Sequence, residues 1–177
     1  MAESGASTQV SGSKPSNVDF FLKVDGIDGE SKDLRHPKEL QLLDFSIGIS
    51  NRGKQSDYGG VSKAVFHNPR FVMYTDFSFP KLKQACATGE RIPKMYLVCR
   101  KAGNVQHEYL RVRFENVYIT SCEIAGGRHP QYPLAPVVEF SISFQIQQIE
   151  YREQKQDGSL AGSMMMTYDL AQLKKNI

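Results

Sequence analysis

Histidine and cysteine side chains are the first candidates for chemistry in this chain. No histidine has a second ligand type three or four residues away, as a zinc site on a helix requires. All four lie in or beside predicted loops, and we expect them to be solvated: His36, His67, His107 and His129. The three cysteines are an odd number without CxxC spacing, which predicts free thiols in a cytoplasmic fold. They are Cys86, Cys99 and Cys122.

Carboxylate and glycine motifs give no stronger signal for catalysis. Asp25, Asp28 and Glu30 in DGIDGE have some likeness to a calcium loop, but the glutamate expected at the twelfth position is missing. The segment GSLAG lacks the GxSxG spacing of a nucleophile elbow, and the chain has neither a GxxxxGK[ST] nor a GxGxxG loop. We therefore expect no enzyme, no catalytic residue, no metal site and no cofactor.

Charge and hydropathy also exclude several classes of protein. The net charge is only +3, and the basic residues are scattered, which argues against a nucleic-acid partner. Arg111 and Arg113 share a strand face with Glu115, a pattern that favours ion pairs across strands. No apolar run approaches the roughly 20 residues of a membrane helix, so no membrane insertion is expected. Residues 1–17 are rich in Ser and Gly and predict a flexible tail without a signal peptide.

The most informative segment is VVEFSISFQIQQI, residues 137–149. Its alternation predicts one long strand with apolar side chains such as Phe140 on one face. Its other face is mostly small and neutral, and it includes Ser141, Ser143 and Gln145. Such a face is typical of a solvated sheet, but it would also suit the lumen of an assembly or a contact between subunits.

The remaining patterns add strands and a single convincing helix. Ser78 as N-cap, Pro80 in the first turn and Gly89 as the stop predict a short helix. A bulge is expected near residues 42 and 43, where the apolar register shifts. Together they predict a mainly β fold, an antiparallel β-barrel with one short flanking α-helix, in a single domain over 18–177. The expected strands are 18–24, 40–49, 70–77, 94–101, 109–124, 137–149 and 163–168.

Several motifs in a fixed order resemble one family. They are GESKD followed by His36, a strand ending in SIGIS, a helix opening with KL, the LVCRKAG hairpin, EYLRVRFENV and FSISFQIQQIEY. From about residue 18 to 169, the chain resembles the haemolysin-coregulated protein (Hcp) family, the tube subunits of bacterial type VI secretion systems. The chain departs from that family in its longer tail, its long segment from Asn51 to Pro69, and Tyr168 at a position where Trp is common.

The resemblance implies a hexameric ring that stacks into a tube and can carry effectors in its lumen. It also implies a contractile sheath and a tip spike as partners. The protein would be found in the bacterial cytoplasm and secreted by the type VI route without a signal peptide. Because the chain stops just after the barrel, we expect a structural member without a fused toxin domain.

The loop from Asp25 to Lys38 is the best candidate for a contact between subunits or rings. Its polar residues Glu30, Asp33, Arg35 and His36 would supply polar pairs at the rim of that contact. Two alternatives remain open from the residues alone. One is a tube subunit of another phage-like contractile particle, and the other is a monomeric ligand-binding β-barrel.

Overall fold

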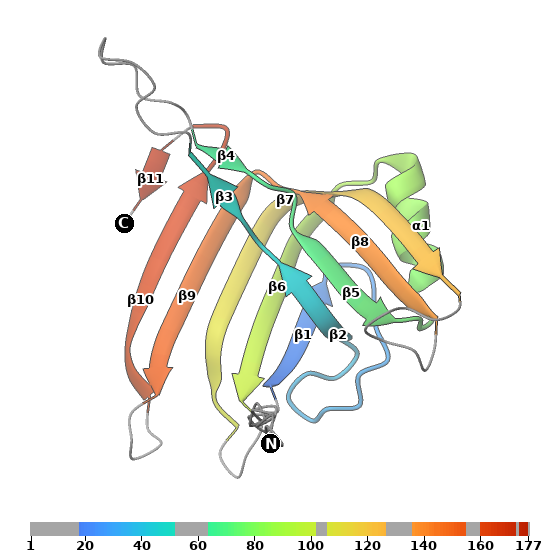
Figure 1. Cartoon of the computed structure of the whole chain (residues 1–177), viewed down its shortest axis with the longest axis horizontal. Coiled ribbons are helices and arrows are strands. Elements are labelled where there is room, and N and C mark those ends of the chain that lie inside the picture. The colour runs from blue at the N-terminus through green and yellow to red at the C-terminus, as the bar shows by residue number, and fades with distance from the viewer. Residues whose placement is uncertain are drawn as a thin grey trace, which may run out of the picture.

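A closed barrel of six antiparallel strands forms the centre of the molecule (Figure 1). The computed structural model describes residues 18–51, 64–101, 106–126, 136–154, 160–172 and 174–176. Around the barrel the strands follow the order β7-β6-β1-β2-β5-β8, and pairing of β8 with β7 closes it. Their bounds are β1 Val18–Val24, β2 Leu40–Ser46, β5 Arg70–Tyr74, β6 Ile92–Lys101, β7 Glu108–Ala125 and β8 Val137–Ser143. The predicted β-barrel is confirmed, whereas the predicted tail lies outside the described residues.

A sheet extension stands away from the barrel, and we call it the wing. It consists of β9 Ile146–Gln154, β10 Leu160–Asp169 and β11 Lys174–Asn176. Strand β7 is long enough to serve both parts, because residues 110–115 pair with β9 and residues 118–125 pair with β8. In Figure 1 the orange-red strands of the wing lie at the left, away from helix α1. The wing therefore has one face that continues the barrel interior and one that continues the barrel exterior.

Buried aromatic and aliphatic side chains fill the barrel. Phe71, Phe114 and Phe140 are fully buried, and the rings of Phe71 and Phe140 lie 5.3 Å apart between centroids at a tilt of 32°. These residues belong to β5, β7 and β8, so they tie together the strands that close the barrel. The apolar positions predicted from alternation in β1, β6 and β8 are confirmed as core, among them Leu22, Leu97 and Ile142.

One helix, α1 (Phe79–Thr88), packs against the barrel beside β7. Leu82 and Ala85 are buried in the core, while Gly89 ends the helix in the left-handed conformation that favours glycine. Ser78 occupies the predicted N-cap position, but its side chain makes no cap hydrogen bond. In the described part of the chain, no helix is long and apolar enough to cross a membrane.

The segment 137–149 forms two strands, so the prediction of one long strand was wrong. Strand β8 ends at Ser143 and β9 begins at Ile146, and the intervening Gln145 holds a corner. Asn116 Nδ2 donates to Gln145 Oε1 at 2.8 Å, and the Gln145 carbonyl accepts from the backbone N–H of Leu170 at 2.9 Å. Because the corner shifts the side-chain register, Gln147 is buried, whereas unbroken alternation through residues 137–149 would place it on the polar face with Ser143 and Gln145.

A small two-stranded sheet crosses the upper part of the wing, and we call it the arm. It consists of β3 Ile49–Ser50 and β4 Val65–Phe66. The Phe66 ring lies 4.6 Å from that of Tyr168 and 6.1 Å from that of Phe144. Tyr168 thus contributes an aromatic contact at the position where the family that this sequence resembles commonly has Trp.

Candidate assembly surfaces

The loop between β1 and β2 is anchored to the outside of the barrel by a buried arginine. Arg100 Nη2 donates to Asp19 Oδ2 at 2.9 Å and to Asp33 Oδ2 at 2.7 Å. The guanidinium carbon also lies 4.8 Å from the centre of the Phe21 ring, within the range of a cation–π contact. Since only 3% of the Arg100 side chain is exposed, this ion pair fixes the middle of the loop to β1 and β6.

His36 forms a second anchor, and it is not the solvated loop residue that we predicted. Its ring stacks on Phe21 with centroids 4.4 Å apart. Nδ1 lies 3.0 Å from Glu39 Oε2, and Nε2 lies 3.4 Å from Glu108 Oε1 without forming a hydrogen bond. Burial raises the pKa of the Glu39 carboxyl, against the lowering effect of the neighbouring His36. The histidine therefore serves to close the loop over an aromatic side chain.

Backbone pairing gives the loop a hairpin-like form. Gly29 N–H donates to the carbonyl of Lys38 at 2.8 Å, and Lys38 N–H donates to the carbonyl of Ser31 at 2.9 Å. A Cβ on Gly29 would collide with the backbone carbonyl of Glu39, so only glycine allows this close approach. The loop is thus a defined structure and not an extended tether.

Between the two anchors the loop presents its tip to solvent. Leu34 lies between the anchored residues Asp33 and His36 and is 98% exposed. Arg35 Nη1 donates to the carbonyl of Gln106 at 3.0 Å, so it reaches toward the start of β7. Glu30 lies farther along, where its Oε1 accepts from the backbone N–H of Phe77 at 3.2 Å. Asp33 Oδ1 accepts from the backbone N–H groups of Arg35 and His36 at 2.9 and 3.2 Å, so three of the four predicted loop residues lie together and Glu30 lies apart.

Sequence reasoning did not find the two residues that organise this loop, Phe21 and Arg100. Phe21 is an apolar residue on the outward face of β1, which signals that something covers that face. Arg100 is 3% exposed at the end of a strand, and an isolated arginine there gives no signal of burial. Leu34 was also missed, because loop apolar residues are common and exposure is invisible in sequence.

We expect Asp33 to make the free energy of unfolding depend on pH in the acid range. Hydrogen bonding to Arg100 is the largest influence that lowers the pKa of Asp33, to about 2. A carboxyl with a lowered folded-state pKa stabilises the fold above its unfolded-state value, and this contribution is lost as the pH falls toward 2. In urea unfolding between pH 5 and pH 2, Asp33→Asn should therefore lose less stability than the parent. Asp28→Asn, which removes the partner of an exposed lysine at 3.8 Å, is the control and should track the parent. If Asp33→Asn and the parent lost the same unfolding free energy between pH 5 and pH 2, this assignment would be wrong.

The predicted polar face divides between two roles in the structure. Ser141 and Ser143 are half-buried on β8, where Ser141 lies opposite Arg70 of β5. Arg70 itself donates to Glu139 at 2.9 Å and lies 3.4 Å from Asp44. Gln145 instead gives its amide to the corner described above. The serines thus remain candidates for a lumen or contact face, while Gln145 already has partners within the chain.

The outer face of β7 and β9 carries paired charges; Arg111 with Glu150 is a pair across strands, as predicted, whereas Arg113 and Glu115 pair within β7. Arg111 Nε donates to Glu108 at 2.8 Å and its Nη1 lies 3.6 Å from Glu150. Arg113 pairs with Glu115, and Arg152 pairs with Glu150 at 2.6 Å. Because each of these arginines has a carboxylate partner in the chain, the face is ionic but internally compensated.

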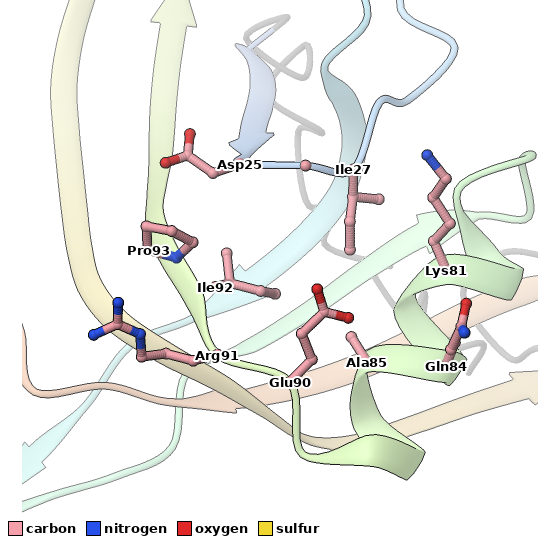
Figure 2. Close-up of a pocket in the computed structure, with 10 residues that line it drawn as sticks. Asp25, Ile27, Lys81, Gln84, Ala85, Glu90, Arg91, Ile92 and Pro93 are labelled. Atoms are coloured by element: carbon pink, nitrogen blue, oxygen red, sulfur yellow. The ribbon is translucent and has the colours of Figure 1, made fainter.

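A cleft of about 520 Å³ lies between α1 and the turn that follows β1 (Figure 2). Lys81 and Gln84 line it from the helix, and Asp25 lines it from the turn. Glu90 and Arg91 line it from the segment that leads into β6, so opposite charges balance around the cleft. Among the described residues, no group of three or more His, Cys, Asp or Glu side chains could hold a metal ion.

Sequence comparison places this fold among secreted proteins of one system. Residues 21–151 match the family described as "Type VI secretion system effector, Hcp". The chain is also 35% identical over 148 residues to Protein hcp1 of Pseudomonas aeruginosa. That alignment covers 82% of this chain and 90% of the relative.

Solved structures share the fold over most of the chain. The crystal structure of Hcp1 from Salmonella typhimurium is 31% identical, covers 90% of this chain and 99% of its own, and gives a TM-score of 0.75. A type VI secretion system effector from Yersinia pestis is 30% identical, covers 85% of this chain and 99% of its own, and gives 0.69. The chain therefore belongs to the Hcp family, the tube subunits of type VI secretion systems, which form oligomeric rings.

Proposed function

We propose that this chain assembles into hexameric rings that stack into the inner tube of a type VI secretion system. A contractile sheath would eject the tube, a spike would sit at its tip, and effectors would travel in its lumen. The protein would be made in the bacterial cytoplasm and exported by the type VI route without a signal peptide, acting as a structural protein and not as an enzyme. The match over nearly the full length of Protein hcp1 is the observation that carries the proposal.

Two features of the molecule support an assembling subunit over a monomeric ligand-binding barrel. The described barrel interior is packed with side chains such as Phe71, Phe114 and Phe140, whereas a binder of that kind needs an interior cavity. In addition, an anchored loop displays an exposed leucine, whose burial by a partner would stabilise an assembly. Electron microscopy of the purified protein tests the proposal, with six-fold rings expected and featureless monomers contradicting it.

The loop from Asp25 to Lys38 is proposed as a contact between subunits or rings, with its tip at the centre. We expect Leu34→Asp to weaken assembly by about 1.5–3 kcal/mol per contact, because burying a leucine contributes that much. The barrel should stay folded, since the side chain is 98% exposed. Sedimentation over a concentration series measures the effect.

Lys32→Asp is the matched control, because it also places an aspartate at an exposed position of the same loop. Asp33 and His36 are unsuitable for this test, since they anchor the loop to the barrel. If Leu34→Asp assembled like the parent, the tip would lie outside the contact.

A further inference from the structure

The two faces of the wing differ sharply in chemistry. On the outer face, the arginines of β7 and β9 are paired with carboxylates, as described above. On the face that continues the barrel interior, most side chains are apolar or aromatic, and we call this the wing face. By strand alternation it also carries Gln147 next to the barrel and Glu153 at the far end of β9. Its apolar and aromatic members are Tyr109, Leu110, Ile149, Tyr151, Met164 and Met166. The charges of the outer face are thus paired within the chain, while the wing face exposes apolar side chains that another surface could bury.

A β-bulge helps to build the wing face. Cys99 lies opposite Leu110 and Arg100 lies opposite Glu108, so Tyr109 is the extra residue. Its ring lies 6.4 Å from that of Tyr151 in an edge-on arrangement. Burial, together with the nearby Cys99 and Tyr151, raises the pKa of the Tyr109 hydroxyl, as expected for a ring turned to the apolar side. The bulge therefore adds an aromatic ring to this surface.

Among the described residues, the arm covers the upper part of the wing face and leaves the lower part exposed. There the arm places Phe66 over Tyr168. Met164 lies four residues from Tyr168 on the same face of β10, which is about 13 Å along a strand. At this lower part Met164 is 78% exposed and Tyr151, its cross-strand neighbour, is 50% exposed. Figure 1 shows the lower halves of β9 and β10 standing clear of the barrel.

The outer edge of β10 is also open in its lower part. Strand β11 pairs with Thr167, Tyr168 and Asp169 only. Among the described residues, no strand pairs with residues 160–166 on that side. An open edge beside an apolar face is a ready site for another chain. Two independent features of the wing, its face and its edge, thus point to the same place.

We propose that the lower wing face of one copy packs against a second copy of this chain. The inference rests on the proposed ring function and names the surface that it uses. A cyclic ring needs a heterologous interface in which one side of each copy meets a different side of the next. A wing that projects from one side of a closed barrel, with an uncovered apolar face, supplies the first of these sides. Methionine is suited to it, because its flexible side chain adapts to a partner surface.

Two adjacent methionines provide the test. Met164→Glu places a charge on the wing face, whereas Met165→Glu places one on the opposite face of the same strand, where the side chain is 47% exposed. By sedimentation, Met164→Glu should raise the concentration of half-dissociation at least about tenfold, and Met165→Glu should leave it near that of the parent. The far-ultraviolet circular dichroism spectra of both variants should match that of the parent and show that the barrel stays folded, since both side chains are exposed.

Peroxide footprinting of the parent protein gives a second readout that needs no substitution. Met164 should oxidise several-fold more slowly in the assembled protein than after dilution, while Met165 should not change. Equal dissociation of both variants, or no dissociation by Met164→Glu in an oligomeric parent, would overturn the wing-face inference alone. A parent that stays monomeric would instead overturn the ring proposal, and the inference with it.

Discussion

Replacing Arg100 with methionine is expected to destabilise the fold by about 3 kcal/mol, the lower end of the range for breaking a buried ion pair. The substitution leaves Asp19 and Asp33 facing each other without a cation, and it removes the cation–π contact to Phe21. The lower end applies because the two carboxylates are 31% and 22% exposed and keep part of their hydration. Urea unfolding at matched protein concentration measures the loss, since assembly couples stability to concentration.

Asp28→Asn is the control for this prediction. It removes an exposed pair with Lys38 at 3.8 Å in the same loop, which contributes at most about 1 kcal/mol. Hydrogen exchange should show that Arg100→Met opens the loop from Asp25 to Lys38 more than it opens the barrel strands. Were Arg100→Met as stable as the control, the anchoring role of the arginine would be wrong.

Phe114→Ala is expected to cost about 3–5 kcal/mol, the usual range for truncating a buried phenylalanine. The ring is fully buried, and it contacts Phe144 at 5.2 Å and Phe71 at 6.4 Å between centroids. It therefore joins β7 to β5 and to the corner that leads into the wing. The same urea experiment measures the loss.

Thr120→Ala, an exposed position on the same strand, is the matched control and should change stability by no more than about 0.5 kcal/mol. A cost for Phe114→Ala near that of the control would mean that the barrel core is not packed as described. A loss of the wing without a loss of the barrel would show that the corner unfolds separately.

The sequence predicted the strands and the helix where a local pattern determines them. Strand β1 has the predicted bounds, α1 ends at the predicted Gly89, and the predicted bulge appears between Leu42 and Asp44. These features depend on alternation, on a glycine at the helix end and on a register shift, and each of these patterns can be recognised from residues close together in the sequence. The barrel itself followed from counting such strands.

Features that depend on distant residues could not be predicted in the same way. Gln145 turns the chain because Asn116 and Leu170 bond to it, and both lie more than twenty residues away in the sequence. His36 is buried because a loop folds back over Phe21, whereas its sequence neighbours Arg35 and Pro37 are exposed. The wing likewise requires that β7 pair with β9 along one part and with β8 along another. The alternation of apolar and polar residues within β7 does not reveal this change of partner.

Two surfaces follow from this arrangement, the tip at Leu34 and the lower wing face at Met164. They lie on different elements, so single substitutions at each can separate their contributions. If the tip joins rings and the wing face closes them, Leu34→Asp should leave single rings, whereas Met164→Glu should leave smaller species.

The native mass of the purified chain, measured by light scattering on a sizing column, tests the central claim most directly. The account predicts a particle of six times the 19.9 kDa of one chain, or a multiple of it where rings stack. A mass of 19.9 kDa that does not change with concentration would contradict the ring.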